Sequence, residues 1–207
     1  MKSYHHGNLK EELINFASVI CERDGYAKLS IRSLAKESNV SQTAPYRHFK
    51  TKEDLYAAVA TEGFHKLHKS VLVQSETLSL QVFIQSSISY IDFGLQNANT
   101  YDLMFGTAVG DFSAHPDLLE AADTTYEDLA SNLASLLAED DPNIIGEKCI
   151  TIWALLHGMV GILRKERIVE ISKNDLFKQV GPMRTTKEIS SNLPAYLEKV
   201  LTGIIKS

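Results

Sequence analysis

This chain of 207 residues is poor in the residues on which several classes of protein depend, with only two cysteines, five prolines and one tryptophan. Cys21 and Cys149 both lie in apolar patterns typical of helices. We therefore expect two buried, reduced thiols and no disulfide bond. The composition does not suit a small protein that is stabilised by disulfides.

Long hydrophobic runs are also lacking. The most apolar stretch, Ile150–Leu163, is interrupted by His157 and two glycines, and it falls short of the roughly 18 apolar residues that a membrane-spanning helix needs. The first residues, MKSYHHGNLKEEL, have no apolar core of the kind found in signal peptides. We therefore expect a cytoplasmic protein that has no membrane as a partner.

The signatures of catalytic sites are missing as well. The chain has no glycine-rich phosphate loop, no nucleophile elbow, and no pair of histidines and carboxylates at metal-ligand spacing. We therefore expect a protein that is not an enzyme and that uses neither a cofactor nor a bound metal.

Strand-like alternation is absent, and the apolar residues recur at helical spacing instead. We predict an all-α fold of about nine helices. Gly181 and Pro182 interrupt the pattern near the end, so we expect a long irregular connection over 168–186. The predicted helices are Asn8–Arg23, Ile31–Ser38, a short one after Ser41, Thr51–Val73, Leu78–Gln96, Tyr101–Phe105, Pro116–Ala138, Asn143–Arg167 and Ser190–Ile205.

The stretch Leu29–Lys52, LSIRSLAKESNVSQTAPYRHFKTK, is typical of two short helices joined by a tight turn. Ser30 is a natural N-cap for the first helix. Asn39 lies at the turn, where asparagine tolerates the left-handed conformation. Ser41 is positioned to cap the second helix. Together with the first helix of the chain, this pair predicts a three-helix unit whose core contains Leu13, Phe16, Ala17, Ile20, Leu34, Val40 and Phe49.

The second helix of the pair is short and polar, with Phe49 as its anchor. Such a helix must be held by its neighbours and presented to a ligand, and DNA is the ligand that suits its hydrogen-bonding groups best. Pro45 lies inside this helix and lacks a backbone N–H, so we expect a tightened or delayed first turn.

The distribution of charge supports a DNA-binding end. The whole chain has a net charge of −5, which by itself argues against binding to nucleic acid. Residues 1–56, however, contain nine Lys and Arg against seven Asp and Glu, and the acidic excess lies entirely in the rest of the chain. A cationic end on an acidic protein can approach phosphate while the acidic bulk stays away.

The same stretch resembles the DNA-binding half of the TetR-type transcriptional regulators. Their pattern is T-x-x-x-I-A-x-x-x-G-V-S-x-x-x-x-Y-x-H-F-x-x-K-x-x-L. The matching residues here are Ser30, Leu34, Ala35, Val40, Ser41, Tyr46, His48, Phe49, Lys52 and Leu55. The resemblance implies a helix-turn-helix DNA-binding domain over 1–51 and a larger helical ligand-sensing and dimerisation domain over 52–207.

The resemblance also implies roles for individual side chains. Tyr46 and Lys52 would contact phosphates, and His48 would lie close to the DNA backbone. Gln42 and Thr43 are the best candidates for reading base edges, and Arg47 suits either role. The DNA-binding candidates are Ser30, Ser41, Gln42, Thr43, Tyr46, Arg47, His48 and Lys52.

A second stretch, ITIWALLHGMVGIL over Ile150–Leu163, places Trp153 and His157 as i, i+4 neighbours beside Gly158 and Gly161. The W-x-x-x-H-G grouping resembles the C-terminal domain of one branch of the family, in which this helix and the last one pair with their copies in a second subunit. An aromatic-rich set is expected to contact a small, mostly apolar or aromatic effector, although ordinary core packing is the better explanation for any single member. This set is Tyr90, Phe93, Tyr101, Met104, Phe105, Phe112, Tyr126, Trp153 and His157.

We therefore predict a homodimeric, ligand-responsive regulator, with repression as the family default. Its partner would be double-stranded operator DNA with a palindromic sequence. The alternative is a nonspecific DNA-binding or adaptor protein without a small-molecule effector.

Overall fold

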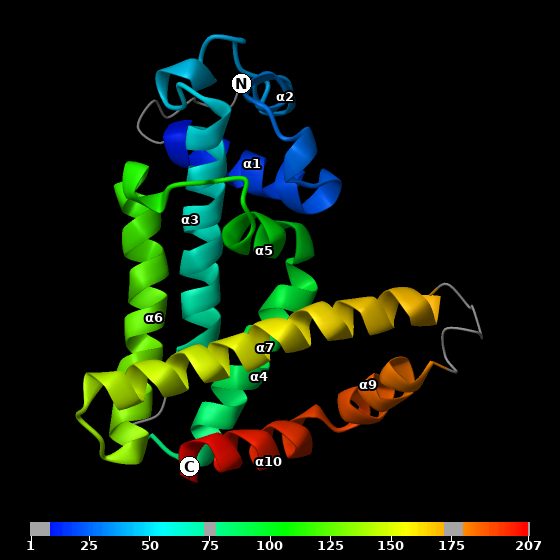
Figure 1. Ribbon diagram of the computed structural model, residues 1–207. Helices are drawn as coiled ribbons and strands as arrows, with labels where there is room; N and C mark the ends of the chain where they lie inside the picture. Colours follow the sequence, from blue (N-terminus) through cyan, green and yellow to red (C-terminus); the bar gives the residue numbers. More distant parts are fainter. Residues whose placement is uncertain (1–8, 73–77, 172–179, 207) are drawn as a thin grey trace. The chain divides into compact units, whose positions relative to one another are not determined.

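A computed structural model of the chain describes residues 9–72, 78–171 and 180–206 (Figure 1). Within these ranges it contains nine α-helices, three short 3-10 helices and no strands, which confirms the predicted all-α fold. The chain forms two compact units. Unit 1 comprises the residues up to His68 together with Asn97–Thr125, and unit 2 comprises Lys69–Gln96 together with the chain from Tyr126 onward. The predicted domain boundary at residues 51 and 52 stays a prediction.

Unit 1 is built around the first helix of the chain, α1, which packs against α2, η1 and α5. The helix α3 begins in this unit and continues into unit 2, and α6 does the same. The elements of unit 1 are α1 (Leu9–Asp24), η1 (Tyr26–Lys28), α2 (Ile31–Glu37), η2 (Pro45–Arg47), α3 (Lys52–Val71), α5 (Ala98–Phe105), η3 (Phe112–Ala114) and α6 (Pro116–Leu137).

The predicted core of the three-helix unit is largely confirmed. Leu13, Ala17, Ile20, Leu34 and Phe49 are all buried. The prediction was wrong for Phe16, whose side chain is 43% exposed, and Val40 is only partly buried. Positions 13, 17 and 20 follow one face of α1, whereas Phe16 lies 100° from Ala17 around the helix, at the edge of that face.

Local capping explains where the helices of unit 1 begin. Ser30 accepts a hydrogen bond from the backbone N–H of Ser33 (3.0 Å), and the Ser33 hydroxyl accepts one from the N–H of Ser30 (2.9 Å). This reciprocal pair is a capping box that satisfies two free donors of the first turn of α2. Asn39 has φ 53°, which confirms its left-handed conformation at the turn. At the start of α3, the backbone N–H of Thr51 donates to the Asp54 carboxylate, and the backbone N–H of Asp54 donates to the Thr51 hydroxyl.

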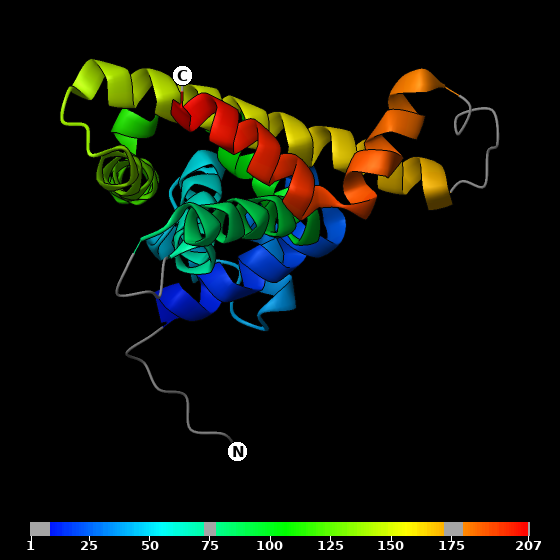
Figure 2. The same cartoon turned by 90° about the horizontal axis from the view of Figure 1, so that it is seen from below.

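Unit 2 consists of the end of α3, α4, part of α6, and the last three helices (Figure 2). The central helix is α4, which packs against both α7 and α10, and α9 packs against α7. Leu133, Ile152, Val160, Leu197 and Leu201 are fully buried in this unit. The bounds are α4 (Leu80–Gln96), α7 (Pro142–Ile171), α9 (Gly181–Ser191) and α10 (Leu193–Lys206).

The predicted irregular connection over 168–186 was wrong at both of its ends. The helix α7 continues to Ile171, and α9 begins at Gly181. Pro182 lies in the first turn of α9, where its missing N–H would have no intrahelical partner in any case. Gly181 and Pro182 therefore mark the start of a helix. Residues 172–179 lie outside the described part of the chain.

By length and composition, one helix in the described residues could cross a membrane, over Pro142–Val169, with a mean hydropathy of 1.3. The core helix of a globular protein passes the same test. Only 33% of the most apolar window of this helix is buried within the chain. Contiguous exposed apolar surface of this kind often marks an interaction site.

Both cysteines are free and buried, as predicted. Burial raises the pKa of the Cys21 thiol to about 11, and burial likewise raises the pKa of Cys149 to about 11. Both side chains are therefore protonated thiols at neutral pH, which makes them poor nucleophiles.

Gly63 on α3 faces α5 so closely that a Cβ atom would lie 2.6 Å from Met104 Sδ and 2.9 Å from Thr100 Cγ2. We predict that Gly63→Ala lowers the stability of the protein by about 1–3 kcal/mol through overpacking. Gly146→Ala is the matched control, because the added Cβ meets only Tyr126 Oη at 3.9 Å, and the better helix propensity should stabilise it by up to about 1 kcal/mol. Urea unfolding midpoints measure both changes, and equal shifts in the same direction would contradict the close packing of α3 on α5.

Candidate nucleic-acid interface

The segment after Asn39 contains a short helical turn in place of the predicted second α-helix. Ser41 does not cap an α-helix: its carbonyl accepts the N–H of Ala44 (3.0 Å) in a turn, and its hydroxyl lies 3.3 Å from that of Thr43. The helical residues are Pro45–Arg47, in 3-10 conformation, with Ala44 as the N-cap. The expected delay at Pro45 explains this, because proline has no N–H to donate and its fixed φ suits the first position of a helix.

Two buried side chains hold this turn to the rest of unit 1. Pro45 is buried, and Phe49 is 1% exposed. The N–H groups of His48 and Phe49 both donate to the Pro45 carbonyl, at 3.0 and 2.9 Å. The predicted DNA-contacting side chains of the segment are all exposed, and Tyr46 retains 54% of its surface. These side chains are Ser41, Gln42, Thr43, Tyr46, Arg47 and His48.

Lys52 is exposed at the first position of α3, and its side chain contacts neighbouring residues of unit 1. Its Nζ is 5.0 Å from the centre of the Tyr56 ring and donates to the Ala27 carbonyl at 3.4 Å. Tyr56 is fixed in turn, since its hydroxyl donates to the Tyr26 carbonyl (2.6 Å). The ammonium group is thus held over an aromatic face close to the start of α3, where its position is defined rather than free.

The start of α3 is also fixed by Asp54. Its Oδ2 accepts the backbone N–H groups of Lys50 (3.0 Å) and Thr51 (2.9 Å). The bond from the Thr51 backbone is the main reason that the pKa of Asp54 lies below its usual range. The carboxylate is therefore ionised at neutral pH, and it orders the chain that joins η2 to Lys52.

A hollow of about 520 Å³ lies over α2 and the turn that follows it. Arg32 and Lys36 line it at i, i+4 on the exposed face of α2, together with Gln42. Ser30 also lines it, although the Ser30 hydroxyl is already used in the capping box. Sequence reasoning missed Arg32 and Lys36. Their signal was available, because the apolar positions of α2 define its buried face and leave these two cations on the other.

The predicted effector-contacting residues fall into two groups, one in each unit. In unit 1, Tyr101 and Met104 are buried, and Phe105 packs against Tyr101 with ring centres 4.6 Å apart. Phe64, which is not among the predicted effector contacts, packs edge-on against both Phe105 and Phe112, with ring centres 5.4 and 6.3 Å away. These contacts form an aromatic cluster within unit 1.

In unit 2, the Trp153 indole N–H donates to the Tyr90 hydroxyl (3.1 Å), which joins α7 to α4. Trp153 and His157 are ring neighbours at 6.0 Å, as their i, i+4 spacing predicts. Phe93 is buried, and Tyr126 is partly exposed. The assignment of these residues to an effector stays a prediction.

The helix α7 has an exposed apolar stripe along its length, which we call the α7 stripe. It consists of Ile150, Trp153, Ala154, Gly158, Gly161, Ile168 and Ile171. Buried residues of α7, such as Ile152 and Met159, lie on the side of the helix opposite Ile150. A Cβ added at Gly158 or Gly161 would meet open space among the described residues, so these glycines serve no close helix contact within the chain.

Comparison with known families gives two matches. The model of the bacterial regulatory proteins of the tetR family matches residues 13–59, which contain most of α1, then η1, α2, η2 and the start of α3. The model of the tetracyclin repressor-like C-terminal domain matches residues 85–180. No curated protein matches the sequence of this chain.

Solved structures share the fold over most of the chain. A protein of unknown function from Rhodococcus sp. RHA1 is 22% identical with a TM-score of 0.71, covering 97% of this chain and 99% of its own. A variant of TetR from Acinetobacter baumannii AYE, in complex with minocycline, is 18% identical with a TM-score of 0.64, covering 95% and 96%. BioQ with its double-stranded DNA operator is 20% identical with a TM-score of 0.58, covering 79% and 92%.

We predict that the two cations of the hollow contact phosphates when duplex DNA binds to unit 1. Arg32→Ala and Lys36→Ala should each weaken binding to any duplex and make the slope of log K against log salt shallower by roughly 1, because one counterion-releasing contact is lost. Lys199→Ala, which removes an exposed cation from α10 in unit 2, should leave the slope unchanged. Fluorescence anisotropy over a salt series measures the slopes, and an unchanged slope in both hollow variants would place these cations away from DNA.

Proposed function

This chain belongs to the TetR family of bacterial regulatory proteins, and we propose that it is a cytoplasmic repressor that binds a palindromic operator as a homodimer and is released by a small-molecule effector. The matching family models show the family and its DNA-binding domain. Repression, binding to a palindromic operator, dimerisation and release by an effector are proposed.

The observation that carries the proposal is the polar turn of unit 1. Pro45 and Phe49 are buried, while every hydrogen-bonding side chain between them and on either side of them is exposed. Folding therefore anchors the segment through two apolar side chains and leaves its polar groups for a ligand. The cations Arg32, Lys36 and Lys52 lie on neighbouring parts of the same unit and suit the phosphates of that ligand.

The expected roles divide by chemistry. Tyr46 and Lys52 donate hydrogen bonds to phosphates, and His48 lies near the DNA backbone. Gln42 and Thr43 precede the proline and belong to a turn, so we propose that they approach base edges from the turn and not from a regular helix. Gln42 suits adenine, and the Thr43 methyl group suits the methyl group of thymine.

The α7 stripe supports the dimer. A stripe with Ile150, Trp153 and Ile168 exposed at 51%, 37% and 61% is costly to leave in water. Gly158 and Gly161 interrupt it with space for another helix to approach closely, and that approach would offset the roughly 1 kcal/mol that each glycine costs in a helix. We propose that the α7 stripe and α10 pair with their copies in a second subunit.

A dimer would also provide the specificity that selecting one DNA site in a genome requires. One short turn reads too few base pairs to select a site in a genome, whereas two copies related by a twofold axis double the contacts. The half-sites would lie about one helical turn of DNA apart.

We propose that the effector acts through a two-state equilibrium. Binding to the aromatic residues of the sensing half would shift α3, which runs from unit 1 into unit 2 and begins at Lys52. A shift of α3 changes the separation of the two DNA-binding turns in the dimer, and only one separation fits both half-sites. The aromatic character of the predicted set favours an apolar or aromatic effector.

The experiment that tests the proposal compares the palindrome upstream of the chain's own gene, or of a neighbouring gene, with random duplex DNA of equal length. We expect the affinity ratio to be about 10³ or more. Tyr46→Ala combined with Lys52→Ala should raise the Kd for the palindrome by about 100-fold or more, because two hydrogen bonds to charged phosphates are lost. Gel-shift titrations measure both.

The double variant must retain the helical circular dichroism spectrum and melting temperature of the wild type, which serves as the control for folding. An affinity that is equal for the palindrome and for random DNA would favour the alternative, a nonspecific DNA-binding or adaptor protein. Complete absence of salt-sensitive DNA binding would overturn both readings.

A further inference from the structure

We propose that Glu22 is a positioning residue for operator binding. Its carboxylate accepts hydrogen bonds from the first turn of α5 and so fixes the position of α1 within unit 1. The position of the DNA-binding turn is fixed together with that of α1. We call this contact the Glu22 latch. This inference rests on the proposed function, since it concerns how tightly the operator is bound.

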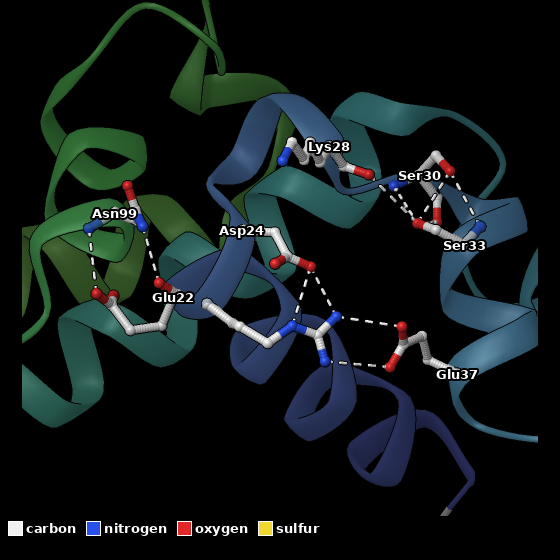
Figure 3. A network of polar contacts seen from close by, with 8 residues as sticks. Glu22, Asp24, Lys28, Ser30, Ser33, Glu37 and Asn99 are labelled. Atoms are coloured by element: carbon white, nitrogen blue, oxygen red, sulfur yellow. Dashed lines mark hydrogen bonds and ion pairs between the residues drawn. The ribbon is translucent and has the colours of Figure 1, made fainter.

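The Glu22 latch joins the last turn of α1 to the first turn of α5 (Figure 3). The Glu22 carboxylate accepts the backbone N–H groups of Thr100 (3.0 Å) and Asn99 (3.4 Å). In return, the Asn99 side-chain amide donates to the backbone carbonyl of Glu22 at 2.8 Å. Beside them, the Cys21 thiol donates weakly to the Asn99 carbonyl at 3.9 Å.

Each helix thereby satisfies groups that the other helix leaves without an intrahelical partner. The first N–H groups of α5 need an acceptor, and its own N-cap residue, Asn97, makes no side-chain capping bond. Glu22 takes that place from another helix, and its negative charge suits the positive end of the α5 dipole. Conversely, the carbonyl of Glu22 lies in the last turn of α1, where Asn99 supplies the missing donor.

Two further contacts connect the latch to the DNA-binding surface. Thr100, whose N–H binds Glu22, also lies against Gly63 of α3, so α5 is in close contact with both α1 and α3. The next residue of α1, Arg23, pairs with Glu37 at the end of α2 at 3.1 Å. The last turn of α1 is therefore the point at which α5 on one side and α2 on the other are held.

This arrangement gives Glu22 an effect on DNA binding that exceeds its effect on folding. With the latch closed, α1, α2 and the turn at Pro45 are presented to DNA in one orientation. Without it, α1 can take several orientations relative to α5, and operator binding must then select one of them at a cost in affinity. Linkage requires the reverse as well, so bound operator must stabilise the latch.

The test uses the full-length protein and the operator palindrome. Glu22→Gln keeps the size of the side chain but removes the charge, and Asn99→Ala removes the returning bond. We expect each variant to raise the operator Kd by about tenfold, in the range typical of coupling between sites. The double variant should raise it by much less than the product of the two single effects, because both substitutions open the same latch.

Two controls separate positioning from a loss of stability. Glu12→Gln removes an exposed carboxylate from the first turn of the same helix and should leave the Kd unchanged. Ile20→Val removes one buried methyl group from α1. It should lower the melting temperature about as much as Glu22→Gln, while its Kd changes by less than roughly twofold.

Hydrogen exchange provides a second measurement that a purely structural role would not affect. In the wild type, adding operator should slow exchange at the Asn99 and Thr100 amides more than at other α5 amides, and Glu22→Gln should abolish this difference. The inference is overturned if Glu22→Gln and Asn99→Ala bind the operator as the wild type does, or lose no more affinity than Ile20→Val. A wild type that binds no operator contradicts the proposed function instead.

Discussion

The segment that we propose to face DNA contains a 3-10 turn, Pro45–Arg47, that is too short to be stable through its own backbone hydrogen bonds. Its conformation is set from outside by the burial of Pro45 and Phe49, by the left-handed Asn39 that brings the chain back from α2, and by the capped start of α3. Within unit 1, α2 packs against the turn, and α1 packs against both α2 and α5. The helices of unit 1 therefore support the turn.

The same constraint explains two features that lie far from the turn in the sequence. A short reading segment gains little affinity if its supports move, which gives the contact between Glu22 and the first turn of α5 a purpose beyond stability. A short reading segment also gains little specificity alone, which supports our proposal that the exposed α7 stripe joins two copies of the chain. Rigid support within one chain would preserve the affinity of the short segment, and pairing of two chains would supply the specificity that it lacks alone.

Much of this was predictable from the sequence because it depends on local patterns. The N-cap at Ser30, the positive φ of Asn39 and the delay at Pro45 each follow from the chemistry of one residue. The start of α9 was missed because proline indicates either the end or the beginning of a helix, and only the structure decides between them. The latch was not predictable, because Glu22 and Asn99 are 77 positions apart and no periodicity relates them. The roles of the DNA- and effector-contacting side chains stay predictions.

The most direct test of the account is the mass of the protein and its operator complex by light scattering, for the wild type and for Gly161→Arg. We predict that the wild type is a dimer that binds one palindrome. The variant places a charge in the α7 stripe, so it should be a folded monomer whose operator affinity is at least about 100-fold lower while its affinity for random DNA is nearly unchanged. Ser131→Arg, at an exposed position on α6, should behave as the wild type. A monomeric wild type, or a Gly161→Arg monomer that binds the palindrome as tightly as the wild type, would contradict the account.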